Sequence, residues 1–259
     1  MTERSEAILL AAGRGSRLGA LTADAPKCLC PVAGHPLIAW QRAALRAAKV
    51  EHVSIVTGYR AALLAPYADS SFHNPDWMRT NMVRSLLCAL PRLDRPVVVA
   101  YSDIVYTAAH VAQLLAQDAP LAITVDMDWE KQWSARFADP LSDAESLRMD
   151  RDGRVLEIGS KPSSMAEVEG QFMGLLRITP EAVRWINREL DTETDANKRN
   201  QMDMTTLLAR LIQSGHPVQG IRVSGQWAEV DAPDDIAYAE TVVTHPDFDV
   251  TLAEPASLD

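Results

Sequence analysis

Residues 7–38 read AILLAAGRGSRLGALTADAPKCLCPVAGHPLI, and they carry most of what the sequence says about the fold. The segment 7–11 is short and apolar throughout and runs into glycine, which is typical of a buried parallel strand. Gly13 and Gly15 follow it directly, and residues 36–50 then have the pattern of a helix with Pro36 at its start. A strand, a glycine-rich loop and a helix in this order predict an α/β sheet that binds ligands at the carboxyl ends of its strands.

Strand and helix patterns alternate in the same way as far as residue 130. Apolar strand patterns are found at 52–58, 71–75, 95–103 and 121–128. Helix patterns lie between them at 59–68, 80–93 and 108–117. This alternation predicts a parallel sheet with helices on both faces, that is, a doubly wound, mostly parallel Rossmann-like α/β fold.

The second half of the chain has a different rhythm. Residues 145–161 resemble a hairpin with Asp152 and Gly153 at its turn. Further strand patterns are found at 170–178, 217–223 and 227–232, and helix patterns at 179–190, 202–215 and 233–243. We therefore expect a single domain over residues 1–259, with a doubly wound half (1–130), a small mixed α+β lobe (131–245) and a loosely held tail (246–259). The polar segment 192–200 is expected to be a loop.

Composition and charge exclude several classes of function. The formal net charge of the 259 residues is −10, which argues against a nucleic-acid partner, because phosphate backbones bind basic faces. The chain has three cysteines, two of them in the sequence CLC. An odd number and this spacing fit neither a disulfide framework nor a zinc site. No apolar run approaches the 18 residues of a membrane span, and the N-terminus is polar rather than a signal peptide. These features predict a cytoplasmic protein with reduced thiols.

The loop behind the first strand has the chemistry of a polyphosphate cradle. Gly13 and Gly15 allow close approach of backbone N–H groups, and Arg14 and Arg17 can fork onto phosphate oxygens. Lys27 adds a mobile charge from the far side of the loop. The pattern is neither a P-loop nor the Rossmann fingerprint, since it lacks G-x-x-x-x-G-K-[ST] and a third glycine. An ordinary strand-to-helix turn with surface arginines is the alternative.

The whole stretch closely resembles the signature of the nucleotidyltransferases that make NDP-sugars and CDP-alcohols, a superfamily that includes the MobA-like enzymes. The signature is L-A-A-G-x-G-[ST]-R-L followed by P-K. The matching residues are Leu10, Ala11, Ala12, Gly13, Gly15, Ser16, Arg17, Leu18, Pro26 and Lys27. The resemblance implies that residues 10–16, Arg14 included, bind the nucleoside triphosphate. It also implies that Arg17 and Lys27 stabilise charge as pyrophosphate leaves.

Two further segments resemble the metal-binding parts of this family. AYSDIVY (100–106) places Asp103 at the end of a strand, with Tyr101 beside it among the expected nucleotide contacts. WAEVDAPDDIAYA (227–239) is similar to a late W-x-[ED]-[IV]-D motif and places Asp231 as the second ligand. The resemblance thus implies one Mg²⁺ held by Asp103 and Asp231, and carboxylates are ligands that Mg²⁺ prefers. A strand-end cap and a helix cap are the alternatives for the two residues.

Within the superfamily the chain is most similar to phosphocholine cytidylyltransferase-like enzymes, which include aminoethylphosphonate and phosphoglutamine cytidylyltransferases. The resemblance rests on segments 74–86, 128–147, 157–162 and 170–175. It implies transfer of CMP from CTP to a small zwitterionic phosphate or phosphonate, with residues 1–130 binding the nucleotide and 131–245 the acceptor. A sugar-1-phosphate nucleotidyltransferase and a non-catalytic nucleotide-sensing subunit are the alternatives. The oligomeric state stays open, a homodimer being one option.

Asn81, Ser85 and Lys161 are further candidates. Asn81 and Ser85 are one helical turn apart and so share a face, where amide and hydroxyl groups could read the cytosine edge. A helix cap and a buried, back-bonded serine are the equally weighted alternatives. Lys161 follows a strand, and only the family resemblance sets it above an ordinary surface lysine and brings it to the acceptor phosphate as a catalytic residue.

The segment VDMDWEKQWSARFADPLSDAE (125–145) is expected to bind the acceptor. Trp129 and Trp133 offer ring faces and Glu145 a carboxylate, which together suit an ammonium group. Arg136 suits a carboxylate or phosphate instead. A zwitterionic acceptor would use all four side chains, whereas an amphipathic loop with solvated charges is the alternative.

Overall fold

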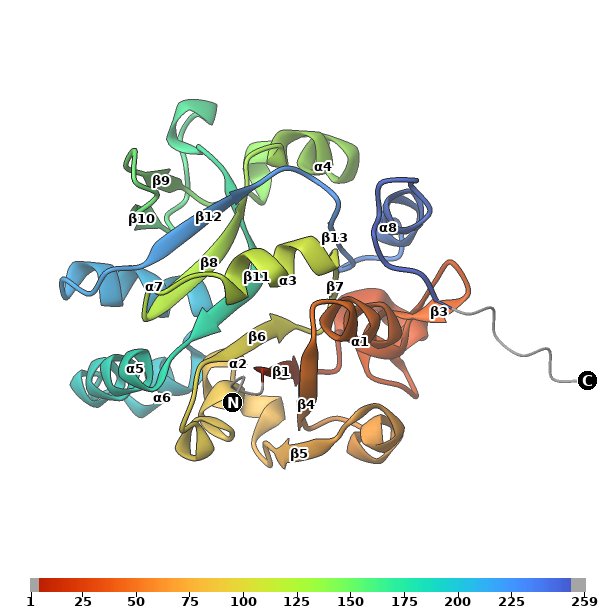
Figure 1. Ribbon diagram of the computed structural model, residues 1–259, viewed down its shortest axis with the longest axis horizontal. Coiled ribbons are helices and arrows are strands. Elements are labelled where there is room, and N and C mark those ends of the chain that lie inside the picture. Colours follow the sequence, from red (N-terminus) through yellow and green to blue (C-terminus); the bar gives the residue numbers. More distant parts are fainter. Residues whose placement is uncertain (1–4, 253–259) are drawn as a thin grey trace, which may run out of the picture.

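The computed structural model describes residues 5–252 and is built around a seven-stranded sheet in the order β12-β8-β11-β6-β1-β4-β5 (Figure 1). All neighbours in this sheet are parallel except β11, which runs antiparallel to both β6 and β8. The strands are β1 (Ser5–Ala11), β4 (Val50–Thr57), β5 (Ser70–His73), β6 (Val97–Tyr101), β8 (Leu121–Asp126), β11 (Gln171–Ile178) and β12 (Gln219–Val223). The predicted doubly wound, mostly parallel sheet is confirmed.

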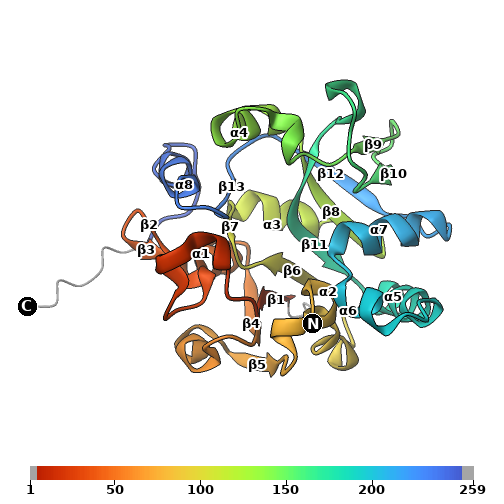
Figure 2. The same cartoon turned by 180° about the vertical axis from the view of Figure 1, so that it is seen from behind.

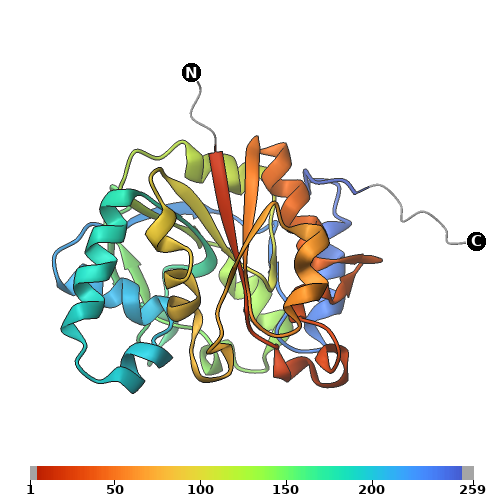
Figure 3. The same ribbon diagram turned by 90° about the horizontal axis from the view of Figure 1, so that it is seen from below.

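Helices cover both faces of this sheet. Successive side chains of a strand point to opposite faces, so each strand contributes to two buried clusters. In β1, Ala7 and Leu9 join one buried cluster, whereas Ile8 and Leu10 join the other. The first cluster takes side chains from α1 (Leu37–Ala47), α3 (Ala108–Leu115), α4 (Trp129–Arg136) and α8 (Asp235–Val243). The second takes them from α2 (Met82–Leu87), α5 (Pro180–Thr192) and α7 (Met204–Gln213). The helix α3 lies on the face of the sheet seen in Figure 1, and α5 and α7 lie on the face seen from behind in Figure 2. In Figure 3 the strand β1 (red) runs between the two layers of helices.

The strand order places the loops after β1 and β6 at one edge of the sheet. The chain leaves β1 for β4 and β5 on one side and then returns to β6 on the other side of β1. Ligands of open α/β sheets bind where the strand order reverses in this way. The buried Gln41 of α1 fixes the second loop, because its Nε2 donates to the carbonyls of Tyr101 (2.6 Å) and Ile104 (2.9 Å).

The second half forms the predicted hairpin, with β9 (Leu147–Met149) antiparallel to β10 (Val155–Ile158). It also forms a short ladder that the sequence did not suggest, in which β13 (Ala228–Glu229) pairs with β7 (Ile104–Val105). This ladder joins the segment before Asp231 to the segment after Asp103. The two candidate acids are therefore brought together by backbone pairing.

One local prediction was wrong, because part of the polar segment 192–200 forms the helix α6 (Ala196–Gln201). The helix predicted at 59–68 is present as a 3₁₀ helix over Ala61–Tyr67. Residues 129–136, for which the sequence predicted no element, form the helix α4. The sequence of α4 mixes polar and aromatic residues, so its helical periodicity is weak. Its two tryptophans, Trp129 and Trp133, pack into the core.

Residues 246–252 pack against the body, so this part of the predicted tail is not loosely held. Phe248 is buried, and its ring lies 6.0 Å from that of Trp40 in an edge-to-face arrangement. The carboxylate of Asp249 accepts hydrogen bonds from the backbone N–H groups of Ala108 (2.7 Å) and Ala109 (3.0 Å) at the start of α3. Residues 253–259 of the predicted tail lie outside the described residues. Within the described part of the chain, no helix has the length and apolarity to cross a membrane.

His110, buried in the capping box of α3, gives an expected pH dependence. Its Nδ1 accepts from the backbone N–H of Thr107, and burial lowers its pKa to about 4, although Asp249 opposes this. Between pH 6.5 and 4 the unfolded chain therefore takes up a proton that the folded chain does not. We expect the free energy of unfolding to fall by about 2–3 kcal/mol across this range.

The check compares urea unfolding of the wild type and His110→Gln between pH 7 and 4. Glutamine keeps an acceptor at this position of the capping box and does not titrate. The free energy of unfolding should fall less in the variant than in the wild type, by the part of the decrease that the protonation of His110 causes. Identical pH profiles of the two proteins would contradict the assignment.

Candidate active site

The glycine loop after β1 is shaped around the side chain of Lys27. Gly15 has φ +74°, and a Cβ there would lie 2.6 Å from Lys27 Cβ. Only glycine therefore suits this position, both for its backbone and for the passage of the lysine. A Cβ on Gly13 would meet no described atom within 4 Å, so the backbone there faces open space. Ser16 and Arg17 are exposed beside it, and a ligand can reach this backbone freely.

Lys27 ends in a cage of carboxylates. Its Nζ lies 2.9 Å from Asp103 Oδ2 and also donates to Asp231 Oδ1. Only 9% of the Lys27 side chain is exposed. Burial alone would lower its pKa, but the charges of Asp103 and Asp231 outweigh burial and raise it. The lysine is thus a fixed ammonium, and Arg17 adds a second cation through Nη2, 2.6 Å from Asp231 Oδ2.

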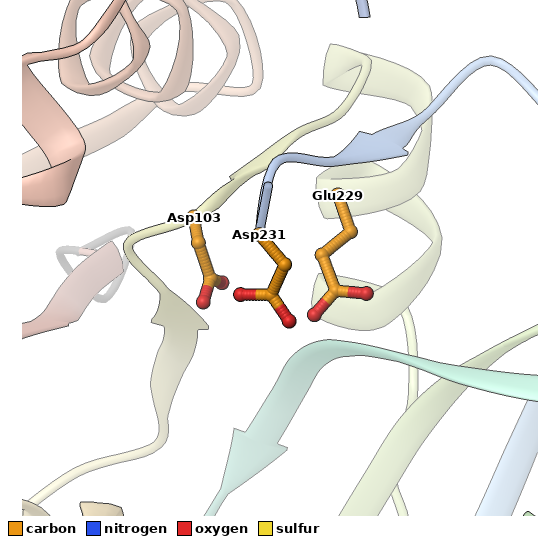
Figure 4. A group of neighbouring side chains, drawn as sticks. All are labelled: Asp103, Glu229 and Asp231. Carbon is orange, nitrogen blue, oxygen red and sulfur yellow. The ribbon is translucent and has the colours of Figure 1, made fainter. Parts of the chain in front are cut away.

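The carboxylates of Asp103, Glu229 and Asp231 form a candidate metal centre. Each offers an oxygen, and these oxygens lie within 4.8 Å of one another (Figure 4). Asp103 Oδ1 is buried and has no hydrogen-bond partner among residues 5–252. Burial and the neighbouring carboxylates of Asp231 and Asp103 together raise the pKa of Glu229 to about 7, although Arg136 and Lys27 oppose them. Three converging carboxylate oxygens fit a hard divalent cation such as Mg²⁺.

Glu229 was not among the candidate ligands drawn from the sequence. The signal was present, because Glu229 and Asp231 are two residues apart in an extended segment. Alternate residues of such a segment point to the same side. The acidic position of the W-x-[ED]-[IV]-D motif therefore faces the same way as its final aspartate.

Arg136 holds the second acidic segment in place and is not part of the lining of the pocket beside the carboxylates. Its side chain is 2% exposed, with Nη1 2.8 Å from Glu229 Oε2 and Nε 2.9 Å from Asp235 Oδ1. Asp235 Oδ2 in turn accepts from the backbone N–H groups of Asp231 and Ala232, both at 2.8 Å. Arg136 therefore orients Glu229 and the turn that carries Asp231. The direct acceptor contact expected for Arg136 is not what the geometry shows.

A cavity of about 240 Å³ adjoins the carboxylates and Arg17; we call it the substrate pocket. Its walls combine aromatic side chains with three further acids. The aromatic residues are Tyr101, Trp133, Phe172 and Trp227, and the acids are Asp143, Glu145 and Asp203. Two of the four residues expected to bind the acceptor, Trp133 and Glu145, thus line this pocket. Trp129 lies outside its lining and packs edge-to-face on Trp133, with ring centroids 6.0 Å apart.

Glu145 carries the clearest electrostatic signature of the substrate pocket. Burial raises its pKa, and the carboxylates of Asp203 and Asp143 raise it further, against a hydrogen bond from Thr205. Thr205 Oγ1 lies 3.2 Å from Glu145 Oε1 and 3.3 Å from Asp203 Oδ1. The region is therefore short of positive charge in the absence of a ligand.

The chain matches known proteins in both sequence and fold. Residues 7–164 match the MobA-like NTP transferase domain. The chain belongs to the MobA-like NTP transferase family. It is 33% identical over 246 residues to the CTP:phosphoglutamine cytidylyltransferase of Campylobacter jejuni, which covers 89% of this chain and 97% of that protein. It is also 30% identical over 118 residues to the 2-aminoethylphosphonate cytidylyltransferase of Lancefieldella rimae, covering 43% and 48%.

The fold of this NTP transferase is similar to that of the inositol-1-phosphate CTP transferase of T. maritima. The TM-score is 0.74 at 17% identity, over 93% of this chain and 97% of that one. The predicted superfamily and its α/β fold are thus confirmed. The motif residues of the first half lie within residues 7–164, which match the family domain, whereas Glu229 and Asp231 lie beyond that range.

The remaining candidates occupy more ordinary positions in this transferase. Asn81 caps α2, its Oδ1 accepting from the N–H of Met82 at 2.8 Å. Ser85 is buried, and its Oγ accepts from Asn74 Nδ2 at 3.1 Å. Lys161 is exposed, and its Nζ donates to the carbonyl of Ser142 at 2.6 Å. Each of these polar groups already has a protein partner, so none points to a ligand on geometry alone.

The residues expected to bind the nucleotide divide into a buried and an exposed group. Leu10, Ala11 and Ala12 are buried, so they could meet a nucleotide only through their backbone. Arg14 is exposed, and its guanidinium lies 5.7 Å from the ring centroid of Tyr59. Its Nε also donates to the carbonyl of Thr22 at 3.3 Å. These contacts hold Arg14 at the mouth of the loop.

Proposed function

We propose that this NTP transferase moves CMP from CTP to a small acceptor that carries a phosphate or phosphonate and a cationic group, releasing pyrophosphate. The observation that carries the proposal is the convergence of the glycine loop, Lys27 and three carboxylates beside an acidic, aromatic pocket. The names of the two relatives support CTP and this acceptor class. Free cysteines at Cys28, Cys30 and Cys88 agree with a cytoplasmic location.

The chemistry requires positioning and charge neutralisation rather than a protein nucleophile. An acceptor phosphate oxygen can itself attack the α-phosphorus of CTP, provided that the two are held in line. The backbone at Gly13 and the exposed Arg17 are placed to bind the triphosphate. The Lys27 ammonium lies at the junction of the loop and the substrate pocket, where it can neutralise charge that develops as pyrophosphate leaves.

Mg²⁺ is the proposed cofactor, and Asp103, Glu229 and Asp231 would hold it. When bound, it supplies positive charge to phosphate oxygens. Asp103 keeps its position through Gln41, and Glu229 through Arg136. These two supports are buried and preorganise the carboxylates before any ligand arrives.

Removal of one carboxylate should weaken metal binding. We expect Glu229→Gln and Asp231→Asn each to bind Mn²⁺, as a probe for Mg²⁺, about tenfold or more weakly, because each loses one of three anionic ligands. Isothermal titration without substrates measures this directly. Asp234→Asn, which changes an exposed acid three residues further along, is the matched control. Wild-type affinity in both site variants would contradict the proposed centre.

The acids of the substrate pocket should act on the acceptor and not on CTP. We expect Glu145→Gln and Asp203→Asn to raise the KM for a cationic acceptor by about tenfold, since each removes a partner for its positive group. The KM for CTP should change little. Asp118→Asn, an exposed acid between α3 and β8, is the control. Equal effects on both KM values would contradict the placement of the acceptor.

A pyrophosphate-release screen tests the function as a whole. CTP, UTP, GTP and dTTP are each offered with aminoethylphosphonate, phosphocholine, phosphorylated amino acids and glucose-1-phosphate. Release with CTP and a cationic acceptor supports the proposal. Preference for glucose-1-phosphate with another nucleotide would identify a sugar nucleotidyltransferase instead. Nucleotide binding without turnover of any pair would favour a sensing subunit.

A further inference from the structure

Glu145 lies in a segment that belongs to no helix or strand, between the 3₁₀ helix Pro140–Ser142 and β9. It is half-buried and lines the substrate pocket. The next residue is held by the backbone, because the N–H of Ser146 donates to the carbonyl of Ser160 at 2.7 Å. At Glu145 itself the partner of the backbone is a side chain, that of Gln171.

Gln171 binds both backbone polar groups of Glu145. Its Oε1 accepts from the N–H of Glu145 at 3.2 Å, and its Nε2 donates to the carbonyl of Glu145 at 2.6 Å. The amide thus takes the place of a neighbouring strand, whose residue would exchange the same two hydrogen bonds. A flipped amide would set donor against donor and acceptor against acceptor, so only this orientation satisfies both groups.

Gln171 is itself fixed by the sheet. It is the first residue of β11, is 5% exposed and pairs with Asp126 at the end of β8. A Cβ on the preceding Gly170 would lie 2.6 Å from Val125 Cγ1, so only glycine lets β11 enter this close to β8. The second hydrogen of Gln171 Nε2 is donated to the carbonyl of Gly170 at 3.0 Å. A glutamine amide has two N–H hydrogens, and both are therefore used within the protein.

The carboxylate that Gln171 holds is one of a pair. Thr205 Oγ1 lies within 3.3 Å of both Glu145 Oε1 and Asp203 Oδ1. A hydroxyl has one hydrogen, so it donates to only one of these carboxylates at a time. An ammonium group offers three N–H donors and can serve both. Asp203 has its own support, because its Oδ1 accepts from the N–H of Thr206 at the start of α7 (2.8 Å).

We propose that Gln171 is a positioning residue that gives the substrate pocket its preference for a cationic acceptor, by holding Glu145 beside Asp203. This inference rests on the function proposed above. Gln171 acts through Glu145 and not on the substrate, since its own donors are occupied. Without Gln171, the carboxylate of Glu145 moves with its irregular segment, and the positive group of the acceptor keeps only Asp203.

The pKa of Glu145 reports where its carboxylate lies. Burial raises this pKa, and the carboxylates of Asp203 and Asp143 add to the effect. Thr205 and Lys161 oppose it. Burial and the two neighbouring acids act only while the carboxylate stays in the pocket.

The first test therefore needs no ligand. Titration of the Glu145 carboxyl carbon by NMR compares the wild type with Gln171→Met, which keeps the length of the side chain and removes its amide. We expect the pKa in the variant to fall towards the ordinary value of about 4.3. Gln219→Met is the matched control, because Gln219 is the first residue of β12 and its Nε2 also donates to a backbone carbonyl, that of Asp152 at 3.0 Å. An unchanged pKa of Glu145 in Gln171→Met would overturn the proposal.

The second test measures the preference itself, with 2-aminoethylphosphonate and ethylphosphonate as probes that differ only in the ammonium group. In Gln171→Met we expect the KM for 2-aminoethylphosphonate to rise about fivefold to tenfold and the KM for CTP to stay the same. The ratio of kcat/KM between the two phosphonates should fall by a similar factor. General damage to the fold would instead lower kcat/KM for both phosphonates equally, and that result would overturn the proposal.

A double substitution shows whether Gln171 acts through Glu145. In a Glu145→Gln background, Gln171→Met should change the KM for 2-aminoethylphosphonate less than twofold, because the carboxylate that it positions is already gone. The same factor in both backgrounds would contradict this route. Gln171→Asn, whose shorter amide cannot span both backbone groups of Glu145, replaces Gln171→Met if the latter fails to fold. No turnover of either phosphonate by the wild type would contradict the proposed acceptor class and with it the preference, while the ligand-free titration still decides whether Gln171 positions Glu145.

Discussion

Replacement of Lys27 by methionine is expected to lower kcat by about 10²–10³-fold in a protein that still folds. Methionine keeps most of the lysine stem, which packs against Gly15, and removes only the charge. The expected loss is that of one preorganised charge at a site of developing negative charge. Steady-state kinetics with CTP and the acceptor identified by the screen measure it.

The buried position of Lys27 sharpens this prediction. A lysine in the loop could have been a solvated side chain, but its ammonium is enclosed by Asp103 and Asp231. Removal of the ammonium leaves Asp103 and Asp231 without their shared cation. Asp231 keeps Arg17 as a partner, but 70% of the Arg17 side chain is exposed. Binding of Mn²⁺ without nucleotide should therefore be as tight in Lys27→Met as in the wild type, or tighter. This separates loss of a catalytic charge from loss of the metal centre.

Lys49→Met is the matched control. Lys49 is exposed at the turn between α1 and β4, at the opposite edge of the sheet from the glycine loop. The same change of charge there should leave kcat unaltered. Near wild-type kcat in a folded Lys27→Met protein would contradict the catalytic role of Lys27.

Local patterns were sufficient to predict the sheet and the glycine loop that follows β1. The apolar segment 7–11, the glycines behind it and the helix after Pro36 are encoded by residues close in sequence. Each fixes its own conformation through sterics and burial. The same holds for Asp103, which follows an apolar run and must therefore lie at the carboxyl edge with the loop.

The support of the site could not be predicted in this way, because it depends on residues far apart in sequence. Arg136 meets Glu229 across 93 residues and Asp235 across 99. Nothing near Arg136 in the sequence distinguishes a buried structural guanidinium from a substrate contact. Likewise the β7–β13 ladder, which brings Asp103 and Asp231 together, joins strands too short to carry a periodic pattern.

Arg136→Met is expected to lower the free energy of unfolding by about 3–5 kcal/mol, because it leaves Glu229 and Asp235 without their buried cation. The methionine still fills space, so lost packing contributes little. Urea denaturation gives the value, provided that the slope with denaturant is unchanged.

Arg210→Met is the matched comparison for this last prediction. Arg210 also pairs with two acids, Glu189 (2.8 Å) and Glu193 (3.0 Å), but its side chain is 23% exposed whereas that of Arg136 is 2% exposed. Water can replace part of its interactions, so the expected loss is about 1 kcal/mol. Arg136→Met should also weaken Mn²⁺ binding, since Glu229 loses its orientation, and Arg210→Met should not. If the two variants lose equal stability and bind Mn²⁺ equally well, Arg136 is one more ion pair and not the support of the carboxylate centre.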